Sequence, residues 1–223
     1  MRFLLSLQQD AKLFIYIHAL LMLFRYAFLV IYSGQLGNAG VGDVAEALWL
    51  GARISLKTTA FLVGFPFVFG TIPYALWKKW PAGGIRKILG SVAVGLMTLL
   101  FMVRIPYYEI FHQGFNIMLF NGMKDDRMAI WQTAVQQYQL WPRLFGAIVL
   151  MAFFIWGLIK FLETPVYYPR HHVRILDMAA VVLVPVFAVF CRFGGAFHSD
   201  SGVPWESAAR TQYTVLNEAV LDD

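Results

Sequence analysis

Positively charged side chains stand at the ends of several apolar runs in this sequence, and they are suited to binding a phosphate group. These cations are Arg53, Lys57, Arg104, Arg143 and Arg192. A guanidinium group can hold two phosphate oxygens through parallel hydrogen bonds. If the runs form a helix bundle, several of these cations can converge into a pocket for a lipid phosphate. The alternative is that each long side chain reaches the membrane interface alone.

A further cation, Arg25, stands inside the first apolar run. A charge within the membrane is energetically expensive, so Arg25 is expected to face the bundle or a polar cavity and to have a partner. Two interpretations follow. Arg25 either contacts a ligand, or it pins the fold through a backbone carbonyl or an acid on another helix. The sequence does not identify the partner.

Glu109 and His112 are spaced to share one face of a helix, where they can form an acid and base pair. The alternative is hydrogen bonding within the loops, since no nucleophile stands near them. The chain contains no G-x-S-x-G, no H-E-x-x-H, no glycine-rich phosphate loop and no Cys or His pair at metal spacing. We therefore predict no catalytic residue, no metal ligand and no cofactor-binding residue in this chain.

The elements that position these residues follow from composition, which excludes an ordinary water-soluble fold. Of 223 residues, 59% are hydrophobic and only 14% are charged, whereas soluble domains have ~25% charged residues. Five runs match the ~20 apolar residues that a helix needs to cross the hydrocarbon core. They cover residues 13–33, 56–76, 88–108, 144–162 and 175–193. The predicted fold is an all-α integral membrane protein with five transmembrane helices.

Charge distribution predicts the orientation of these helices. The formal net charge of +5 does not indicate a nucleic-acid partner, because Lys and Arg lie between apolar runs and not on a soluble face. Cytoplasmic loops carry the excess of Lys and Arg in membrane proteins. The basic connections 77–87 and 163–174 lie on the same side as the N-terminus if the runs alternate. The N-terminus is therefore predicted to be cytoplasmic and the C-terminus extracytoplasmic.

Three segments on the predicted outer side have amphipathic patterns. They cover residues 41–52, 127–141 and 205–221. Such a pattern is typical of a short helix that lies on the membrane surface, and it also occurs in helices that only pack against neighbours. The lone Cys191 is expected to be a small buried residue near a helix end.

Breaks within the apolar runs leave one more alternative. Pro66, Gly70 and Pro73 interrupt the second run, and Pro185 interrupts the fifth. Such breaks either bend helices around their neighbours or open a cavity. Together with Arg25 they are compatible with a channel or transporter, but the sequence has no internal repeat of the kind that transporters contain.

Three stretches carry a resemblance to a known family. They read GARISLKTTAFL at 51–62, RIPYYEIFHQGFNIMLFNGMKDD at 104–126 and CRFGGAFHSDSGVPWESAARTQYTVLNEAVLDD at 191–223. They resemble the N-terminal membrane region of the lipoteichoic acid synthase family, which are sulfatase-fold phosphoglycerol or phosphoethanolamine transferases of the alkaline phosphatase superfamily. The best match is Arg192, Gly194 and Gly195, followed by Asn217 and Leu221.

One position departs from the family pattern. After the second outer segment the family tends to have Gly-x-Arg-x-Asp, whereas Gly51 and Arg53 are followed here by Ser55 in place of the acid. The Arg and Asp pair of the family pattern is therefore not present at this place.

The resemblance implies a domain organisation. A five-helix transmembrane domain at 1–193 is followed by an extracytoplasmic juxtamembrane linker helix at 194–223. A catalytic domain then moves a headgroup from a phospholipid to a glycan or glycolipid at the outer face of the bacterial cytoplasmic (inner) membrane. That domain, with its Thr nucleophile and its divalent metal (Mn, Mg or Zn), is absent from these 223 residues. The sequence is therefore expected to be a piece of a longer protein or of a split one.

The function implied by the resemblance is that of a multi-pass module that anchors the transferase and presents its lipid. The expected partners are the membrane, an anionic phospholipid, and the chain's own or a separate sulfatase-like catalytic domain. Whether the chain belongs to an enzyme at all stays open. The alternative is a stand-alone membrane protein that binds a lipid or a partner without catalysis.

Overall fold

The computed structural model describes residues 2–77, 79–115, 140–166, 173–203 and 213–221. Within these ranges the chain is helical and contains no β-strand, which confirms the predicted all-α class for this part of the chain. The long helices are α1 (Arg2–Ile31), α2 (Val41–Pro66), α4 (Ala82–Phe111), α7 (Leu140–Glu163) and α8 (Val173–Arg192). The short elements are η1 (Ser33–Gln35), η2 (Phe67–Thr71), α3 (Ile72–Leu76), η3 (Ser199–Ser201) and α9 (Thr214–Val220).

Within the described ranges, five segments are long and apolar enough to cross a membrane. They are Phe3–Ile31, Val41–Leu76, Ala82–Phe111, Trp141–Glu163 and Ile175–Arg192. Each overlaps one of the predicted runs, which confirms the prediction of five helices long and apolar enough to span a membrane. The first and third helices are longer than predicted, at 30 residues each.

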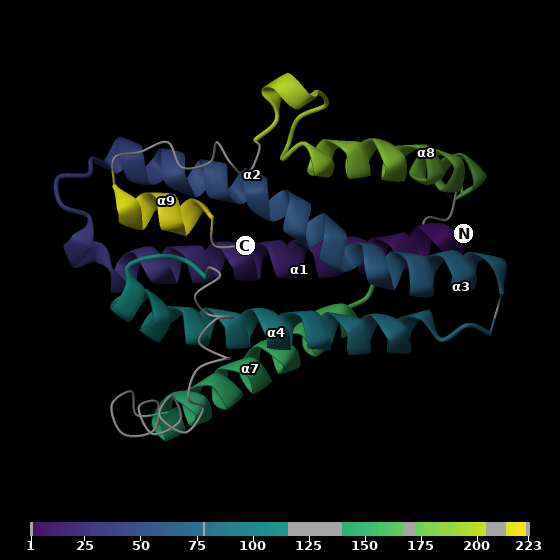
Figure 1. Ribbon diagram of the computed structural model, residues 1–223. Helices are drawn as coiled ribbons and strands as arrows, with labels where there is room; N and C mark the ends of the chain where they lie inside the picture. Colours follow the sequence, from purple (N-terminus) through teal and green to yellow (C-terminus); the bar gives the residue numbers. More distant parts are fainter. Residues whose placement is uncertain (1, 78, 116–139, 167–172, 204–212, 222–223) are drawn as a thin grey trace, which may run out of the picture.

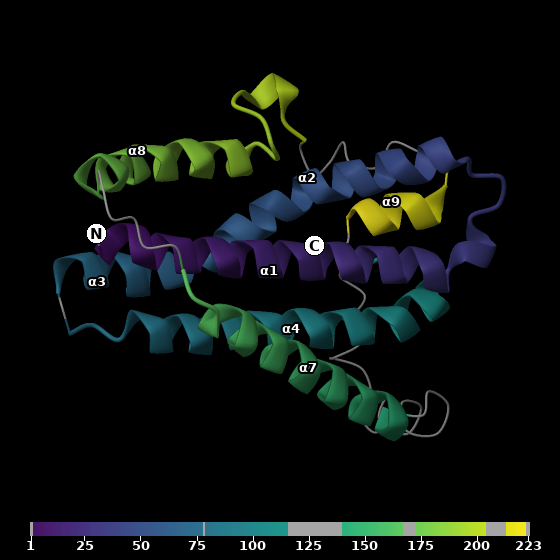
Figure 2. The ribbon, with the colours of Figure 1, turned by 180° about the vertical axis from the view of Figure 1, so that it is seen from behind.

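Helix α1 forms the centre of the bundle. It contacts α2 and α8 on one side and α4 and α7 on the other (Figures 1 and 2). Its buried side chains recur every three or four residues and include Leu13, Ile17, Leu20, Leu21, Phe24 and Phe28. That spacing places them on one broad face of the helix. The short helix α9 lies along α1 and α2 and belongs to the same hydrophobic core.

The second span contains the break that the sequence predicts. Helix α2 ends at Pro66, the next turn, Phe67–Thr71, is a π-helix, and α3 continues with Pro73 in its first turn. A proline lacks the backbone N–H and its ring crowds the preceding turn, and the π-helical turn accommodates this change. The break places Thr71 in the interior, where its side chain is fully buried. The break predicted at Pro185 is wrong, because α8 stays α-helical through this residue.

The predicted outer helices have different outcomes. The separate surface helix over 41–52 is wrong, because these residues are the first turns of α2, which runs on to Pro66. The buried face of these turns includes Ala47, Leu50 and Gly51, while Trp49 is 66% exposed. Most of 127–141 lies outside the described residues. Of 205–221, only α9 with its flanking residues is described, and it packs into the bundle.

Cysteine labelling tests the predicted orientation. Cys191 is buried near the end of α8, as predicted, so a thiol reagent should not label the folded protein. In a Cys191→Ser background, Ser199→Cys should react with a membrane-impermeant maleimide in spheroplasts, because this side chain is exposed on the predicted outer side. The exposed Lys79→Cys should react only after permeabilisation. The opposite pattern would reverse the orientation.

Candidate functional site

The cation Arg25 is completely buried, and two of its hydrogen-bond partners lie on two other helices. Its Nε atom donates to the carbonyl of Ala219 at 2.7 Å, and its Nη1 atom donates to the hydroxyl of Ser55 at 2.7 Å. Ala219 is in the last turn of α9, and Ser55 is in the middle of α2. Arg25 therefore joins α1, α2 and α9 through a backbone carbonyl, which is one of the two roles that the sequence left open.

The position of Arg25 depends on a missing side chain at Gly51. A Cβ atom at residue 51 would lie 2.6 Å from Cδ and from Cζ of Arg25, which is much closer than nonbonded carbon atoms approach. Gly51 and Ser55 are one helical turn apart on the same face of α2. The missing side chain at Gly51 leaves room for the guanidinium, and the hydroxyl of Ser55 accepts its hydrogen bond.

Arg104 binds the α9 carbonyl next to the one that Arg25 binds. Its Nη2 atom donates to the carbonyl of Glu218 at 2.7 Å, and its guanidinium lies over the ring of Phe28, 4.3 Å from the centroid. Arg104 is only 5% exposed. The last turn of α9 thus offers two consecutive carbonyls to two buried arginines, at the end of a helix where the backbone dipole favours cations.

Glu218 places a carboxylate beside this pair of cations. The backbone N–H of Gly114 hydrogen-bonds the carboxylate, and Arg104 interacts with it electrostatically. Burial raises the pKa of Glu218, and the Arg104 charge and the Gly114 hydrogen bond partly oppose that rise.

A cavity of about 790 Å³ opens next to Arg104 and Glu218. Its apolar walls come from α1, α2 and α4 and include Leu21, Phe24, Phe61, Leu62, Leu96 and Phe101. Its polar lining consists of Thr58 on α2 and of a group around Glu218, namely Arg104, Gln113, Gly114 and Glu218 itself. Small-molecule sites commonly have this form, with ~300–1,000 Å³ of mostly apolar volume and a few polar groups. We call it the Arg104 cavity.

Two of the predicted cations hold the loop that follows α8. Arg53 donates from Nε to the carbonyl of Gly194 at 2.7 Å and from Nη2 to that of Ser201 at 2.6 Å. Lys57 donates to the carbonyl of Val203. Gly194 has a φ of 63°, in the left-handed region, which glycine adopts without strain. Arg53 and Lys57 therefore anchor the loop 194–203, which includes Gly194 and Gly195.

The remaining predicted residues lie apart from these groups. Arg143 and Glu109 form an ion pair at 3.5 Å between side chains that are 40% and 58% exposed. His112 ends α4 with a φ of 51°, and its ring meets that of Tyr108 edge-on. Arg192 is exposed, with its guanidinium 6.0 Å from the ring centroid of Phe193. Glu109, the acid predicted to pair with His112, is therefore paired with Arg143 on α7.

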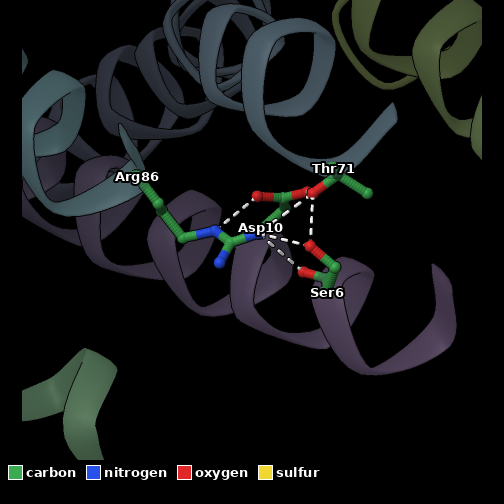
Figure 3. Close-up of polar contacts among 4 residues, drawn as sticks. All are labelled: Ser6, Asp10, Thr71 and Arg86. Atoms are coloured by element: carbon green, nitrogen blue, oxygen red, sulfur yellow. Dashed lines mark hydrogen bonds and ion pairs between the residues drawn. The ribbon is translucent and has the colours of Figure 1, made fainter. Parts of the chain in front are cut away.

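Sequence reasoning missed a second polar cluster, at the opposite end of α1. Arg86 on α4 donates from Nε to the carboxylate of Asp10 on α1 at 2.6 Å, and both side chains are almost fully buried. Figure 3 shows Ser6 and Thr71 completing the cluster. Arg86 Nη2 donates to both hydroxyls, at 2.8 Å for Ser6 and 2.9 Å for Thr71. Thr71 in turn donates to Asp10.

Asp10 lies before the first predicted run, 13–33, and Arg86 lies in the predicted basic connection 77–87, so neither was expected inside the bundle. A charge normally ends an apolar run, but two opposite charges that meet in the interior satisfy each other and let both helices continue. Ser6 and Asp10 are four residues apart and therefore share a face of α1, which is the one sequence signal of this cluster.

Comparison with known proteins adds no family assignment, since no family model, no curated protein and no solved structure matches this chain. Among the described residues, no group of three or more His, Cys, Asp or Glu side chains is arranged to hold a metal ion.

Substitution of Gly51 tests whether Arg25 requires the space left at this residue. Gly51→Ala should lower the free energy of unfolding by about 1–3 kcal/mol, because the new methyl group displaces the guanidinium. Gly64→Ala is the matched control in the same helix, since a Cβ there has no neighbour within 4 Å. It should raise the stability by about 0.5–1 kcal/mol. Denaturant titration in mixed micelles measures the free energy of unfolding of both variants. Equal changes in the two variants would contradict the role of Gly51 in making room for Arg25.

Substitution of Asp10 tests the second cluster. Asp10→Asn leaves the Arg86 charge buried without its carboxylate, so we expect a loss of about 3–5 kcal/mol in the same titration. The double variant Asp10→Asn with Arg86→Gln should recover part of this loss. Glu163→Gln, in the exposed pair with Lys87, is the control and should leave the unfolding midpoint unchanged. An unaltered midpoint in Asp10→Asn would show that the buried pair does not stabilise the fold.

Proposed function

We propose that this chain is the membrane-anchoring and lipid-presenting part of a cell-envelope phosphoglycerol or phosphoethanolamine transferase similar to the lipoteichoic acid synthases. The proposal rests on the residue resemblance of the outer segments and on one structural observation, the Arg104 cavity. In this role the chain lies in a bacterial cytoplasmic membrane with its C-terminal side outward. It holds a phospholipid by the phosphate and the acyl chains, and a sulfatase-like domain performs the chemistry.

The shape of the Arg104 cavity supports binding of an amphiphile. Along α4 its lining runs from Ala93 to Arg104, and a separation of 11 positions along a helix corresponds to about 16 Å. The polar group around Arg104 and Glu218 borders one part of it, and most of the remaining lining is apolar. A phospholipid has the same division, with an anionic phosphate at one end and hydrocarbon over the remainder.

Arg104 is the residue that we expect to bind the phosphate. A guanidinium keeps its charge in any environment that a protein offers, and its planar fork of donors matches phosphate oxygens. The surrounding ring of Phe28 and the helices exclude water, and low polarity strengthens the attraction between opposite charges. The proposal is restricted to the phosphate, which anionic and zwitterionic phospholipids share.

The other cations support the same role less directly. Arg53 and Lys57 fix the loop 194–203 against α2, and Arg25 fixes α9, which contributes Glu218 to the cavity. In the proposed transferase these contacts set the position of the segments next to the lipid site. The divalent metal that the resemblance implies belongs to the catalytic domain, outside this chain.

A stand-alone membrane protein that binds lipid without catalysis is the second candidate, because the Arg104 cavity alone supports binding and not transfer. The two candidates differ in what the coding DNA contains after codon 223. An open frame that encodes a domain with a Thr nucleophile and metal ligands favours the transferase, and an immediate stop codon favours the stand-alone protein.

Lipid retention tests the proposed site. In native mass spectrometry of the purified chain, Arg104→Gln should reduce bound phospholipid about tenfold or more, because a charge-assisted hydrogen bond contributes ~1.5–3 kcal/mol. Arg192→Gln is the control, since Arg192 is exposed and does not line the cavity. It should retain the wild-type amount.

A second variant distinguishes loss of lipid binding from loss of folding, since Arg104→Gln could reduce bound lipid by unfolding the protein. Leu100 lines the cavity and is 55% exposed, so Leu100→Trp can fill the apolar part with little strain on the core. It should also reduce bound phospholipid while the thermal unfolding midpoint stays at the wild-type value. Full lipid retention in both Arg104→Gln and Leu100→Trp would refute the site.

A further inference from the structure

The polar end of the Arg104 cavity carries a negative group as well as a positive one. Arg104 and Glu218 both line it, together with Gln113 and Gly114. A site for a purely anionic headgroup gains nothing from a carboxylate at this place, because like charges repel. We propose that Glu218 is a specificity-determining residue, and that it selects phospholipids whose headgroup carries an ammonium group beside the phosphate. This inference rests on the proposed lipid-binding function.

The local geometry holds Glu218 in a defined position. Its backbone carbonyl accepts a hydrogen bond from Arg104 at 2.7 Å, so the main chain of α9 is fixed at this residue. Its carboxylate accepts the backbone N–H of Gly114, which follows α4. The carboxylate is therefore oriented toward the 113–115 segment and borders the cavity together with it.

Charge complementarity identifies the class of headgroup. A phosphate needs a donor with positive charge, which Arg104 supplies, and an ammonium group needs an anionic acceptor, which Glu218 supplies. A zwitterionic headgroup such as phosphoethanolamine satisfies both at once. A phosphoglycerol headgroup satisfies Arg104 and leaves Glu218 without a cation from the ligand.

Burial makes this distinction effective. A carboxylate in an apolar setting is costly when it is ionised, and burial accordingly raises the pKa of Glu218. A ligand ammonium at this place offsets that cost, whereas a second anion adds to it. The expected preference is therefore at least about fivefold, since hydrogen bonds to charged groups contribute more than ~1 kcal/mol.

Competition between two phospholipids tests the inference. The full chain is reconstituted with equal amounts of phosphatidylethanolamine and phosphatidylglycerol of identical acyl chains, and bound lipid is counted by native mass spectrometry. Wild type should retain phosphatidylethanolamine at least about fivefold over phosphatidylglycerol. Glu218→Gln keeps the shape and an acceptor for Gly114 and should abolish the preference. Glu218→Asp should retain part of it, and the exposed Glu163→Gln should retain all of it.

The possible outcomes separate this inference from the proposed function. Equal retention of the two lipids by wild type, or an undiminished preference in Glu218→Gln, would overturn the role of Glu218 and leave phosphate binding by Arg104 intact. Retention of neither lipid by wild type would overturn the proposed function itself. A preference that disappears only in Glu218→Gln supports both.

Discussion

A buried guanidinium on α1 sets the constraint on which the rest of this structure depends. Arg25 has no access to water, so its donors must be satisfied within the bundle. The carbonyl of Ala219 and the hydroxyl of Ser55 accept hydrogen bonds from it, and Gly51, one turn before Ser55 on α2, leaves room for the guanidinium. Together these contacts fix α2 and α9 against α1. Helix α9 has only seven residues, too few to be stable alone.

The position of α9 in turn shapes the polar end of the Arg104 cavity. Val215, Leu216, Ala219 and Val220 are buried in the common core, and this packing turns Glu218 toward the end of α4. Arg104 then binds the carbonyl of Glu218, one residue before the carbonyl that Arg25 binds. Two arginines on different helices thus position one short helix, and that helix supplies the only carboxylate that lines this cavity among the described residues.

Hydropathy was enough to predict the five spans, because burial in a membrane requires about 20 apolar residues whatever the neighbours are. The cost of burying Arg25 was equally evident from sequence. Its partner was not, since Ala219 is 194 residues away and a backbone carbonyl has no residue-type signature. Asp10 and Arg86 were missed for a related reason: each ends an apolar run when considered alone, and only their contact makes them interior residues. Ser55, which departs from the family pattern, proves to be a partner of Arg25.

The cations of this chain therefore divide by the kind of acceptor that they bind. Arg86 meets a carboxylate, so the pair is neutral as a whole, and its contribution is to join α1, α4 and the π-helical turn. Arg143 is likewise paired with Glu109. Arg104 donates to a backbone carbonyl and has the carboxylate of Glu218 beside it, and its guanidinium borders a cavity. A phosphate can bind a guanidinium only where a ligand has room to approach it. Arg86 and Arg143 do not line this cavity, so the described structure favours Arg104 over both as the phosphate-binding residue.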